Sequence, residues 1–215
     1  MGKRISSSVW CAAVLLAATA VLAEGIEAIK LPPPQMEGGK PLMQALKERR
    51  SSREFGPEKL TEQVLSNLLW AADGVNRADG RRTAPSAVNW QAIDIYVATS
   101  DGLHLYDAKA HALAAILAED VRELTGTQPF VKEAPVNLVY VADYSRMGKA
   151  SDADKDFYAG ADTGFISQNV YLFCASEGLA TVVRGSVDRE ALAKAMKLEP
   201  TQRIILAQTV GYPKK

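Results

Sequence analysis

Three arginines and two serines stand together in one short stretch of the sequence, at Arg49, Arg50, Ser51, Ser52 and Arg53. A guanidinium group binds two phosphate oxygens at once, and a serine hydroxyl adds a further hydrogen-bond donor. The stretch ends a predicted helix and precedes a Gly-Pro turn, so its charges could equally be solvated and interact with the negative end of the helix dipole. The residues alone leave a phosphate site and a solvated helix end as equal alternatives.

A second stretch, residues 82–91, combines small side chains with amide side chains. It contains Pro85, Ser86, Ala87 and Asn89, which would let a planar ligand approach the backbone. The alternative is an ordinary loop that enters a helix with Ser86 as its N-cap. The residues of this stretch by themselves favour the ordinary loop.

Several common kinds of catalytic chemistry lack their sequence patterns. His104 and His111 lie seven residues apart without a cysteine or carboxylate at ligand spacing, so we expect no metal site. The sequence has no GxSxG, P-loop or GxGxxG pattern for acyl transfer, NTP chemistry or Rossmann dinucleotide binding. Cys174 falls in an apolar helical stretch, which predicts a buried, unreactive thiol.

Hydrophobic periodicity and capping residues predict a mixture of helices and strands that would position these side chains. Thr61 is the expected N-cap of one helix, Gly74 is its terminator, and Gly178 is expected to end a long apolar helix. Residues 144–157 are strongly charged and are expected to form a surface loop. The expected helices cover residues 41–50, 61–73, 112–124, 160–176 and 188–196, and the expected strands cover 93–99, 103–106, 135–142, 181–183 and 203–210.

The composition limits the function further. The 215 residues include 25 basic and 25 acidic side chains, so the formal net charge is zero. This balance provides no excess of positive charge for binding nucleic acid or an anionic membrane surface. Hydrophobic residues make up 47% of the chain, which excludes general disorder and allows one substantial core. Without an internal repeat or linker, we expect one mixed domain over residues 41–215.

Residues 1–23 have the features of a secretory signal peptide. Two basic residues precede the uncharged stretch 9–23, and Ala23 is a small residue at the expected cleavage position. The uncharged stretch is shorter than the roughly 20 residues that span a bilayer, which favours cleavage over a membrane anchor. We expect an exported protein, periplasmic or secreted, with no stable membrane insertion after cleavage. Residues 24–40, rich in proline and glycine, are expected to form an extended arm that lies on a neighbouring chain or stays mobile.

In combination, these segments resemble the FMN-dependent nitroreductase superfamily over residues 41–213. The stretch RRSSREF at 49–55 resembles the family motif Arg-x-Ser-x-Arg/Lys-x-Phe, and PSAVNWQ at 85–91 resembles the family loop Pro-Ser-x-x-Asn-x-Gln. The order of the motifs, the long apolar helix and the closing strand add to the match. Within the superfamily, residues 96–113 are most like the SagB/ThcOx branch, which includes dehydrogenases that oxidise azoline rings in modified peptides.

The resemblance implies an α+β nitroreductase-like fold, with a central, mostly antiparallel sheet flanked by helices, and a homodimer with one FMN in each of two clefts between subunits. Arg49, Arg50 and Ser51 would hold the flavin phosphate and ribityl chain, and Arg53 would lie near the pyrimidine edge of the ring. Lys214 and Lys215 would either help to neutralise the phosphate or form a disordered polar tail. The resemblance also implies flavin contacts from the partner subunit, through Pro85, Ser86, Ala87 and Asn89. Val183, Arg184 and Gly185 would contact the flavin as well, with the backbone N–H groups of Arg184 and Gly185 facing flavin N5 and O4.

The resemblance also implies that hydride passes through flavin N5 between a reduced donor and an acceptor such as a nitroaromatic or a quinone. The flavin itself would be the only catalytic group. Export would separate the protein from cellular NADH and NADPH, so the donor stays open among NADH, NADPH, a quinol and the substrate itself. Two alternatives are an azoline-type dehydrogenase that oxidises a heterocycle or peptide, and a non-catalytic protein that binds or scavenges FMN.

Overall fold

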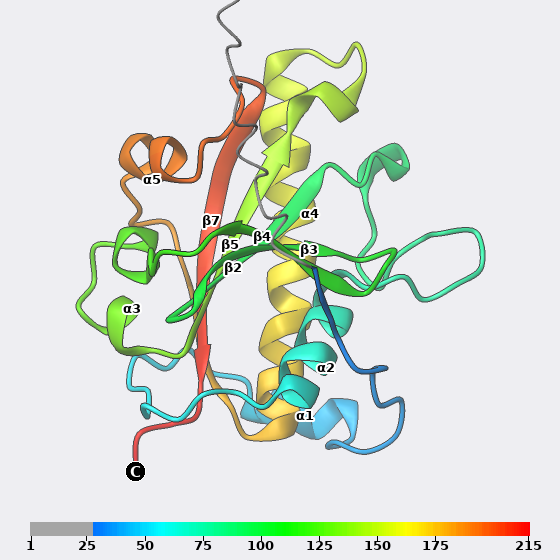
Figure 1. Cartoon of the computed structure of the whole chain (residues 1–215). Coiled ribbons are helices and arrows are strands. Elements are labelled where there is room, and N and C mark those ends of the chain that lie inside the picture. The colour runs from blue at the N-terminus through cyan, green and yellow to red at the C-terminus, as the bar shows by residue number, and fades with distance from the viewer. Residues whose placement is uncertain (1–27) are drawn as a thin grey trace, which may run out of the picture.

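The computed structural model describes residues 28–215, so the expected signal peptide at 1–23 lies outside the described residues. Seven strands form one antiparallel sheet in the order β1-β4-β3-β2-β5-β7-β6 (Figure 1). The strands are β1 (Ile29–Lys30), β2 (Ile93–Thr99), β3 (Gly102–Asp107), β4 (Ala112–Leu117), β5 (Val136–Asp143), β6 (Ala180–Arg184) and β7 (Gln202–Gly211). The helices are α1 (Leu42–Glu48), α2 (Glu62–Asp73), α3 (Phe130–Glu133), α4 (Asp152–Glu177) and α5 (Arg189–Ala195), with short 3-10 helices η1 (Ala87–Asn89), η2 (Arg122–Thr125) and η3 (Tyr144–Met147). This arrangement confirms the predicted α+β class.

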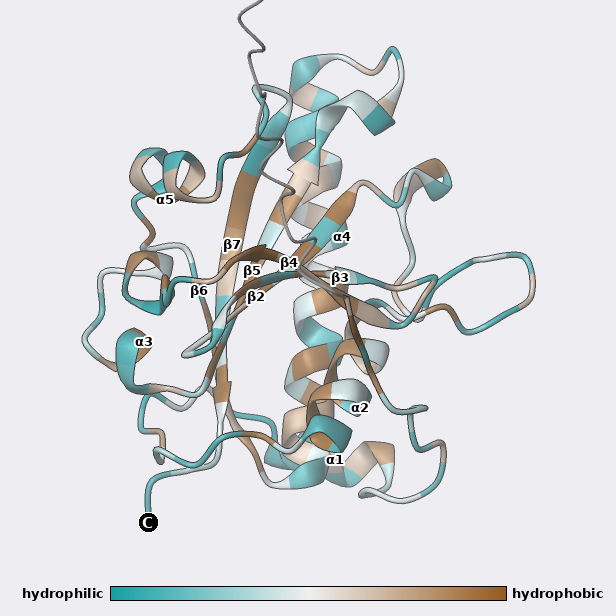
Figure 2. Cartoon of the chain, in the orientation of Figure 1, coloured by the Kyte–Doolittle hydropathy of each residue, from teal (hydrophilic) through white to brown (hydrophobic). Residues whose placement is uncertain are grey.

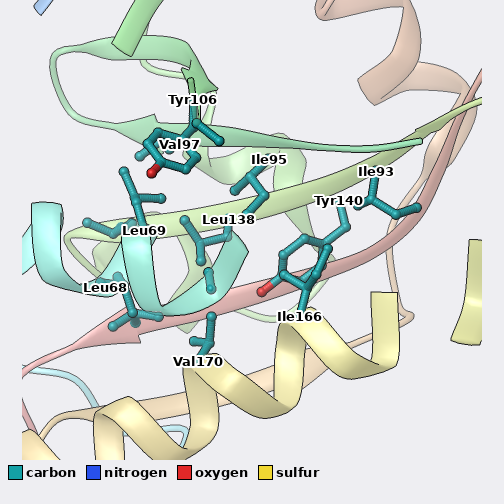
Figure 3. Packing of buried hydrophobic residues seen from close by; sticks show 14 of the residues in the cluster. Leu68, Leu69, Ile93, Ile95, Val97, Tyr106, Leu138, Tyr140, Ile166 and Val170 are labelled. Atoms are coloured by element: carbon teal, nitrogen blue, oxygen red, sulfur yellow. The ribbon is translucent and has the colours of Figure 1, made fainter. Parts of the chain in front are cut away.

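The longest helix, α4, covers one face of the sheet together with α2. Leu68 and Leu69 of α2 and Val170 of α4 are fully buried in one apolar cluster with side chains of β2 and β5. Figure 3 shows side chains from both helices pointing toward those of the strands. Hydrophobic and hydrophilic residues alternate along the turns of α4 in Figure 2, as expected for a helix that buries one face.

The opposite face of the sheet is covered by α5. Leu192 and Met196 pack with Val139 and Val141 of β5, because successive residues of a strand point to opposite faces. All of β5 from residue 136 to 142 is buried. This burial on both faces explains why the sequence of β5 is almost continuously apolar rather than alternating.

Capping residues determine where α2 begins and where α4 ends. Thr61 accepts a hydrogen bond from the Val64 amide at 3.3 Å and caps α2, as predicted. Gly178 adopts a left-handed conformation with φ of 73° and ends α4, as predicted. Glycine adopts this conformation without the steric cost that a Cβ atom adds.

The predicted start of α4 at residue 160 is wrong. The helix begins eight residues earlier, because Ser151 caps it and accepts a hydrogen bond from the Asp154 amide at 3.2 Å. Asp152 and Asp154 in the first turn interact favourably with the positive end of the helix dipole. The charged stretch 144–157 therefore contains η3 and the first turns of α4, rather than being a surface loop throughout.

The helix predicted at residues 112–124 is also wrong. Residues 112–117 form β4, which pairs with β3 on one side and with β1 on the other. Alanine and leucine are good helix formers, but this intrinsic preference is weak and is often overridden by tertiary contacts. The ladder hydrogen bonds and the burial of Leu113, which is 4% exposed, outweigh that preference.

The first described residues pack on their own chain. Ile29 pairs with Leu113 of β4, and Leu31 is buried in the main apolar cluster. The Ser66 hydroxyl donates a hydrogen bond to the Pro32 carbonyl at 2.6 Å, which fastens this segment to α2. Residues 29–32 thus belong to the fold of their own chain, in contrast to the expected neighbour-bound or mobile arm.

Candidate functional site

The basic stretch at residues 49–53 lies directly after α1, where the chain runs beside β6. Arg49 occupies the C-cap position with an extended backbone, so the helix ends before the basic residues. The Ser52 amide donates to the Thr181 carbonyl at 2.9 Å, and Phe55 forms an isolated β-bridge with Pro213 near the end of the chain. The stretch is therefore held between the edge strand β6 and the C-terminal segment.

A groove of about 560 Å³ lies between this stretch, the C-terminal half of α4 and the start of β6. Its volume is in the range of pockets that hold small molecules and cofactors. The charged side chains that line it are Lys40, Lys47, Glu48, Arg49 and Arg50. Lys40 donates to Glu48 at 2.6 Å and lowers the pKa of Glu48, so this carboxylate is ionised and already paired. The groove has a surplus of positive charge.

The arginines of the stretch are not neutralised by the part of the chain that the structure describes. Within residues 28–215, no carboxylate lies within ion-pair distance of Arg49, Arg50 or Arg53. Neighbouring cations repel one another, and a phosphate group would relieve this repulsion while accepting hydrogen bonds from the guanidinium groups. The groove residues therefore fit an anionic ligand.

Tyr171 of α4 is a functional candidate that the sequence analysis missed. Its hydroxyl lies 2.7 Å from Oγ of Ser51 and accepts a hydrogen bond from the Val183 amide at 3.0 Å. The guanidinium carbon of Arg49 lies 5.2 Å from the centre of the Tyr171 ring, a cation–π distance. The only sequence signal was a hydroxyl-bearing side chain on the apolar face of a predicted helix.

The segment from Val183 to Gly185 leads out of β6, with the Val183 amide bonded to Tyr171 and Arg184 paired with Ala207 of β7. Gly185 has no left-handed conformation, and a Cβ atom there would meet only Cδ2 of Leu206, at 3.7 Å. The protein's own packing therefore does not require glycine at this position. The Arg184 side chain is 7% exposed and donates to Asn137 at 2.6 Å and to Thr209 at 2.8 Å.

Burial has a clear electrostatic effect on Arg184. It lowers the pKa of this guanidinium to about 10, because burial disfavours the charged form. The group is still protonated at neutral pH, and no described carboxylate pairs with it. A buried arginine of this kind fixes the end of β6 through its hydrogen bonds rather than through an ion pair.

Lys214 lies beside the basic stretch. Its backbone amide donates to the Glu54 carbonyl at 3.4 Å, and its side chain is exposed. Pro213, the preceding residue, lines the groove. The chain end thus adds positive charge next to Arg53.

The second predicted stretch, residues 82–91, is an irregular loop between α2 and β2. Ser86 is not an ordinary helix cap, because its hydroxyl donates to Oδ2 of Asp162 at 2.9 Å and accepts from the Gln91 amide at 2.8 Å. Val88, Asn89 and Gln91 all have positive φ angles, of 50°, 57° and 48°. Such angles are costly for residues other than glycine, and they occur preferentially at functional sites. Val88 is also 81% exposed.

A buried ion pair between Arg82 and Asp73 contacts the loop at residues 82–91. Arg82 donates to the carboxylate of Asp73, which is 5% exposed, and to Oε1 of Gln91 at 3.2 Å. Burial raises the pKa of Asp73 to about 7, although the charge of Arg82 and its hydrogen bond lower it. The carboxyl group therefore changes its charge near neutral pH.

The two predicted stretches do not meet within one chain. Tyr171 lines the groove beside Arg49, whereas Asp162 lines the small cavity next to Pro85 and Ser86. No residue lines both cavities. Asp162 and Tyr171 lie nine residues apart in α4, which corresponds to about 13 Å along the helix axis. Within one chain the two stretches therefore line separate cavities.

The other candidate reactive groups have structural roles. Burial raises the pKa of the Cys174 thiol far above its usual range, so the thiol stays protonated. His111 hydrogen-bonds to Ser66 at 2.7 Å and to Tyr106 at 3.0 Å. Residues 28–215 contain no cluster of three His, Cys, Asp or Glu side chains that could hold a metal ion.

None of the described helices is long and apolar enough to cross a membrane.

Comparison with known proteins identifies the family. Residues 46–212 match the model of the nitroreductase family. A protein of Methanocaldococcus jannaschii assigned as a nitroreductase is 34% identical over 169 residues, which cover 74% of this chain and 85% of the relative. A crystal structure of a protein from Ralstonia eutropha, also assigned as a nitroreductase, is 44% identical and superposes with a TM-score of 0.84, covering 87% of this chain and 90% of that one.

A more distant relative carries a more specific name. The FMN reductase [NAD(P)H] of Bacillus subtilis is 22% identical over 186 residues, which cover 80% of this chain and 66% of the relative. The family match covers most of the described domain, and its fold agrees with the sheet and helices described above. The chain belongs to the nitroreductase family and is an oxidoreductase with the nitroreductase fold.

Proposed function

We propose that the protein binds FMN and transfers hydride through flavin N5 between a reduced donor and an acceptor such as a nitroaromatic or a quinone. The observation that carries this proposal is the groove lined by Arg49 and Arg50, neither of which has a described carboxylate within ion-pair distance. FMN would supply the two-electron chemistry, so no side chain has to act as a nucleophile or metal ligand. The name of the Bacillus subtilis relative supports this choice of cofactor.

The basic stretch would bind the polar end of the flavin. In this proposal Arg49, Arg50 and Ser51 hold the phosphate and the ribityl chain, and Lys214 adds positive charge nearby. Arg53 would lie at the pyrimidine edge of the ring, where its charge would stabilise the negative charge that a reduced flavin carries around N1 and O2. Arg49, Arg50 and Arg53 have no ion pair among the described residues. This supports the assignment, because a phosphate would not have to compete with internal carboxylates for these arginines.

The end of β6 would bind the reactive part of the ring. In the proposal Val183 lies against the flavin, and the backbone N–H groups of Arg184 and Gly185 donate to N5 and O4. The buried hydrogen bonds of the Arg184 side chain would keep this backbone in place. Glycine at position 185, which the chain's own packing does not require, would allow a ring to approach closely.

We also propose that the active unit is a homodimer with flavin sites at the subunit interface. Pro85, Ser86, Ala87 and Asn89 would come from the second chain, which explains why they lie about 13 Å along α4 from the basic groove in their own chain. The strained loop that carries these residues is exposed at Val88, as a segment that contacts another chain would be.

An exposed apolar surface on α4 supports the dimer. Phe157 is 69% exposed and Phe165 is 48% exposed, although phenylalanine is usually buried. Gly160 and Gly164 lie between them with open space where a Cβ atom would be. Small residues between large apolar ones allow a second helix to pack closely, and an exposed apolar surface of this kind marks an association site. A second copy of α4 offers the same surface, so the contact can be symmetric.

An azoline-type dehydrogenase is the second candidate function. It is favoured by residues 96–113, whose sequence resembles that of the SagB/ThcOx branch. These residues form the end of β2, all of β3 and the start of β4. In that case the heterocyclic or peptide substrate itself would be the reductant, and oxygen or a quinone would be the final acceptor.

The first experiment is an absorption spectrum of the purified chain after incubation with FMN and gel filtration. Flavin bands between 300 and 550 nm that persist with the protein support the proposal, and a colourless protein that takes up no FMN contradicts it. Anaerobic titration with NADH, NADPH, a quinol and azoline heterocycles then separates the candidates. Bleaching only by a heterocycle favours the dehydrogenase, whereas bleaching by a nicotinamide or a quinol favours the general oxidoreductase.

We further propose that the protein is exported, because residues 1–23 have the charge and length pattern of a signal peptide. Expression in a bacterial host followed by fractionation and mass spectrometry tests this. A periplasmic protein that begins at Glu24 supports export. An intact N-terminus in the cytoplasmic fraction contradicts it.

A further inference from the structure

The hydroxyl group of Tyr171 joins two segments that lie far apart in the sequence. It contacts Oγ of Ser51 at 2.7 Å, across 120 residues, and accepts from the Val183 amide at 3.0 Å. The tyrosine is only 7% exposed, and its ring also lies beneath the guanidinium group of Arg49. One side chain of α4 therefore touches both parts of the proposed flavin site, the basic stretch and the end of β6.

The contact between Tyr171 and Ser51 allows two arrangements of the hydrogen atoms. A backbone N–H can only donate, so the phenol oxygen of Tyr171 accepts from Val183. Between the two hydroxyl groups, either oxygen can be the donor. In the arrangement in which the phenol donates, Ser51 accepts this bond and keeps its own hydroxyl hydrogen free to donate elsewhere.

We infer that Tyr171 is a positioning residue, which donates a hydrogen bond to Ser51 and so directs the hydrogen of the exposed Ser51 hydroxyl to an anion bound beside Arg49. This inference rests on the proposed function, in which the anion is the phosphate of FMN. The oxygens of a phosphate dianion accept hydrogen bonds but do not donate them, so a serine that binds phosphate must present its hydrogen. Without the phenol, the Ser51 hydroxyl could rotate and direct its hydrogen to another acceptor.

A purely structural role for Tyr171 makes a different prediction. If the phenol only supports β6 through Val183, its removal would disturb the segment from 183 to 185, which we place against the flavin ring. Binding of every flavin would then weaken equally, with or without a phosphate group. If the phenol acts through Ser51, only flavins that carry a phosphate are affected.

The test compares Tyr171→Phe with the unchanged protein in binding FMN and riboflavin, followed by quenching of flavin fluorescence. Phenylalanine keeps the ring beneath Arg49 and removes only the hydroxyl group. Riboflavin has the same ring and ribityl chain as FMN but no phosphate. We expect the Kd for FMN to rise about 10-fold, as for loss of one hydrogen bond to a charged group, and the Kd for riboflavin to stay within about twofold.

Two further variants make the comparison specific. Ser51→Ala should weaken FMN binding by a similar factor, and adding Tyr171→Phe to it should cause no further loss, because the two residues act in series. Tyr144→Phe removes a tyrosine hydroxyl that hydrogen-bonds to Asp156, away from the groove, and should leave both Kd values unchanged.

The outcomes show whether the role of Tyr171 fails alone or whether the proposed function fails as well. If the unchanged protein binds FMN but Tyr171→Phe binds it equally well, or loses FMN and riboflavin to the same extent, the inference is wrong and the proposed function stands. Additive losses in the double variant would likewise overturn it. If the unchanged protein binds neither flavin, the proposed function fails and the inference fails with it.

Discussion

The hydroxyl group of Ser86 donates a 2.9 Å hydrogen bond to Asp162, a carboxylate that is only 3% exposed in the middle of α4. The amide of Ala87 also donates to this carboxylate, at 3.2 Å. One buried acid thus holds the loop at the point just before Val88 and Asn89 adopt positive φ angles. The shape of the loop is imposed by α4, and its strain is balanced by these hydrogen bonds.

Replacing Asp162 should therefore release the loop. Asp162→Ala leaves the Ser86 hydroxyl and the Ala87 amide without their acceptor, which should lower the free energy of unfolding by about 1–3 kcal/mol. Urea denaturation measures this loss, and hydrogen exchange should show faster exchange at the Ala87 amide. Glu119→Ala is the control, because that side chain is exposed and forms no ion pair among the described residues, so the change in stability should be less than about 0.5 kcal/mol. Equal losses in the two variants would contradict the role given to Asp162.

The buried pair of Asp73 and Arg82 predicts a particular pH dependence. Burial raises the pKa of Asp73 from its ordinary value of 3.8 to about 7 in the folded chain, so the folded state binds the proton more tightly than the unfolded state. Its contribution to stability is complete below about pH 4 and is lost as the pH rises toward 7.

Comparison with the Asp73→Asn variant separates the contribution of Asp73 to stability from the contributions of the other carboxylates. Asp73→Asn cannot titrate, so its stability relative to the unchanged protein should increase between pH 4 and pH 8. Urea denaturation at several pH values measures the difference. A relative stability that is constant across this range would show that Asp73 has an ordinary pKa in the folded protein.

The basic stretch gives a direct prediction for cofactor retention. Arg49→Ala combined with Ser51→Ala should weaken FMN binding by about 10- to 1000-fold, because charge-assisted hydrogen bonds to the phosphate are lost. Gel filtration followed by absorbance at the flavin bands measures the retained FMN. Lys59→Ala removes a positive charge at an exposed ion pair with Asp101 and should retain FMN fully. A double variant that still purifies with stoichiometric flavin would place the site elsewhere.

The exposed apolar surface of α4 predicts how the dimer can be broken. Phe165→Arg places a charge on this surface and should shift the protein to monomers in sedimentation velocity, with loss of bound FMN, since each proposed site needs both chains. Leu124→Arg, at a 41% exposed position in η2 on the other side of the sheet, should leave the dimer intact. A folded monomer that keeps its FMN would rule out the shared site.

Several features of the fold could be predicted from sequence because they depend on neighbouring residues. Thr61 caps α2 and Gly178 ends α4 through bonds within a few residues of each. The β2 and β3 hairpin follows from alternating apolar residues around a short turn. The stretch 82–91 lies between a helix and a strand, as expected, whereas Arg49 and Arg50, which the expected helix 41–50 included, follow the end of α1.

Other features could not be predicted because they depend on contacts between distant residues. Residues 112–117 form a strand only because β3 and β1 lie beside them, which outweighs the helical preference of alanine and leucine. Tyr171 reaches Ser51 across 120 residues, and Ser86 reaches Asp162 across 76. Neither pair leaves a pattern in the local sequence.

The sequence by itself determined the chemistry that the protein has available: clustered guanidinium and hydroxyl groups, a loop of small and amide residues, and no nucleophile or metal-ligand pattern. The tertiary structure alone decided how these groups are used. It leaves the arginines without described carboxylates beside a groove, brings Tyr171 to Ser51, and separates the two motif stretches along α4. The physical reason is that residue types set which bonds are possible, whereas packing against the sheet sets which atoms come within range of one another.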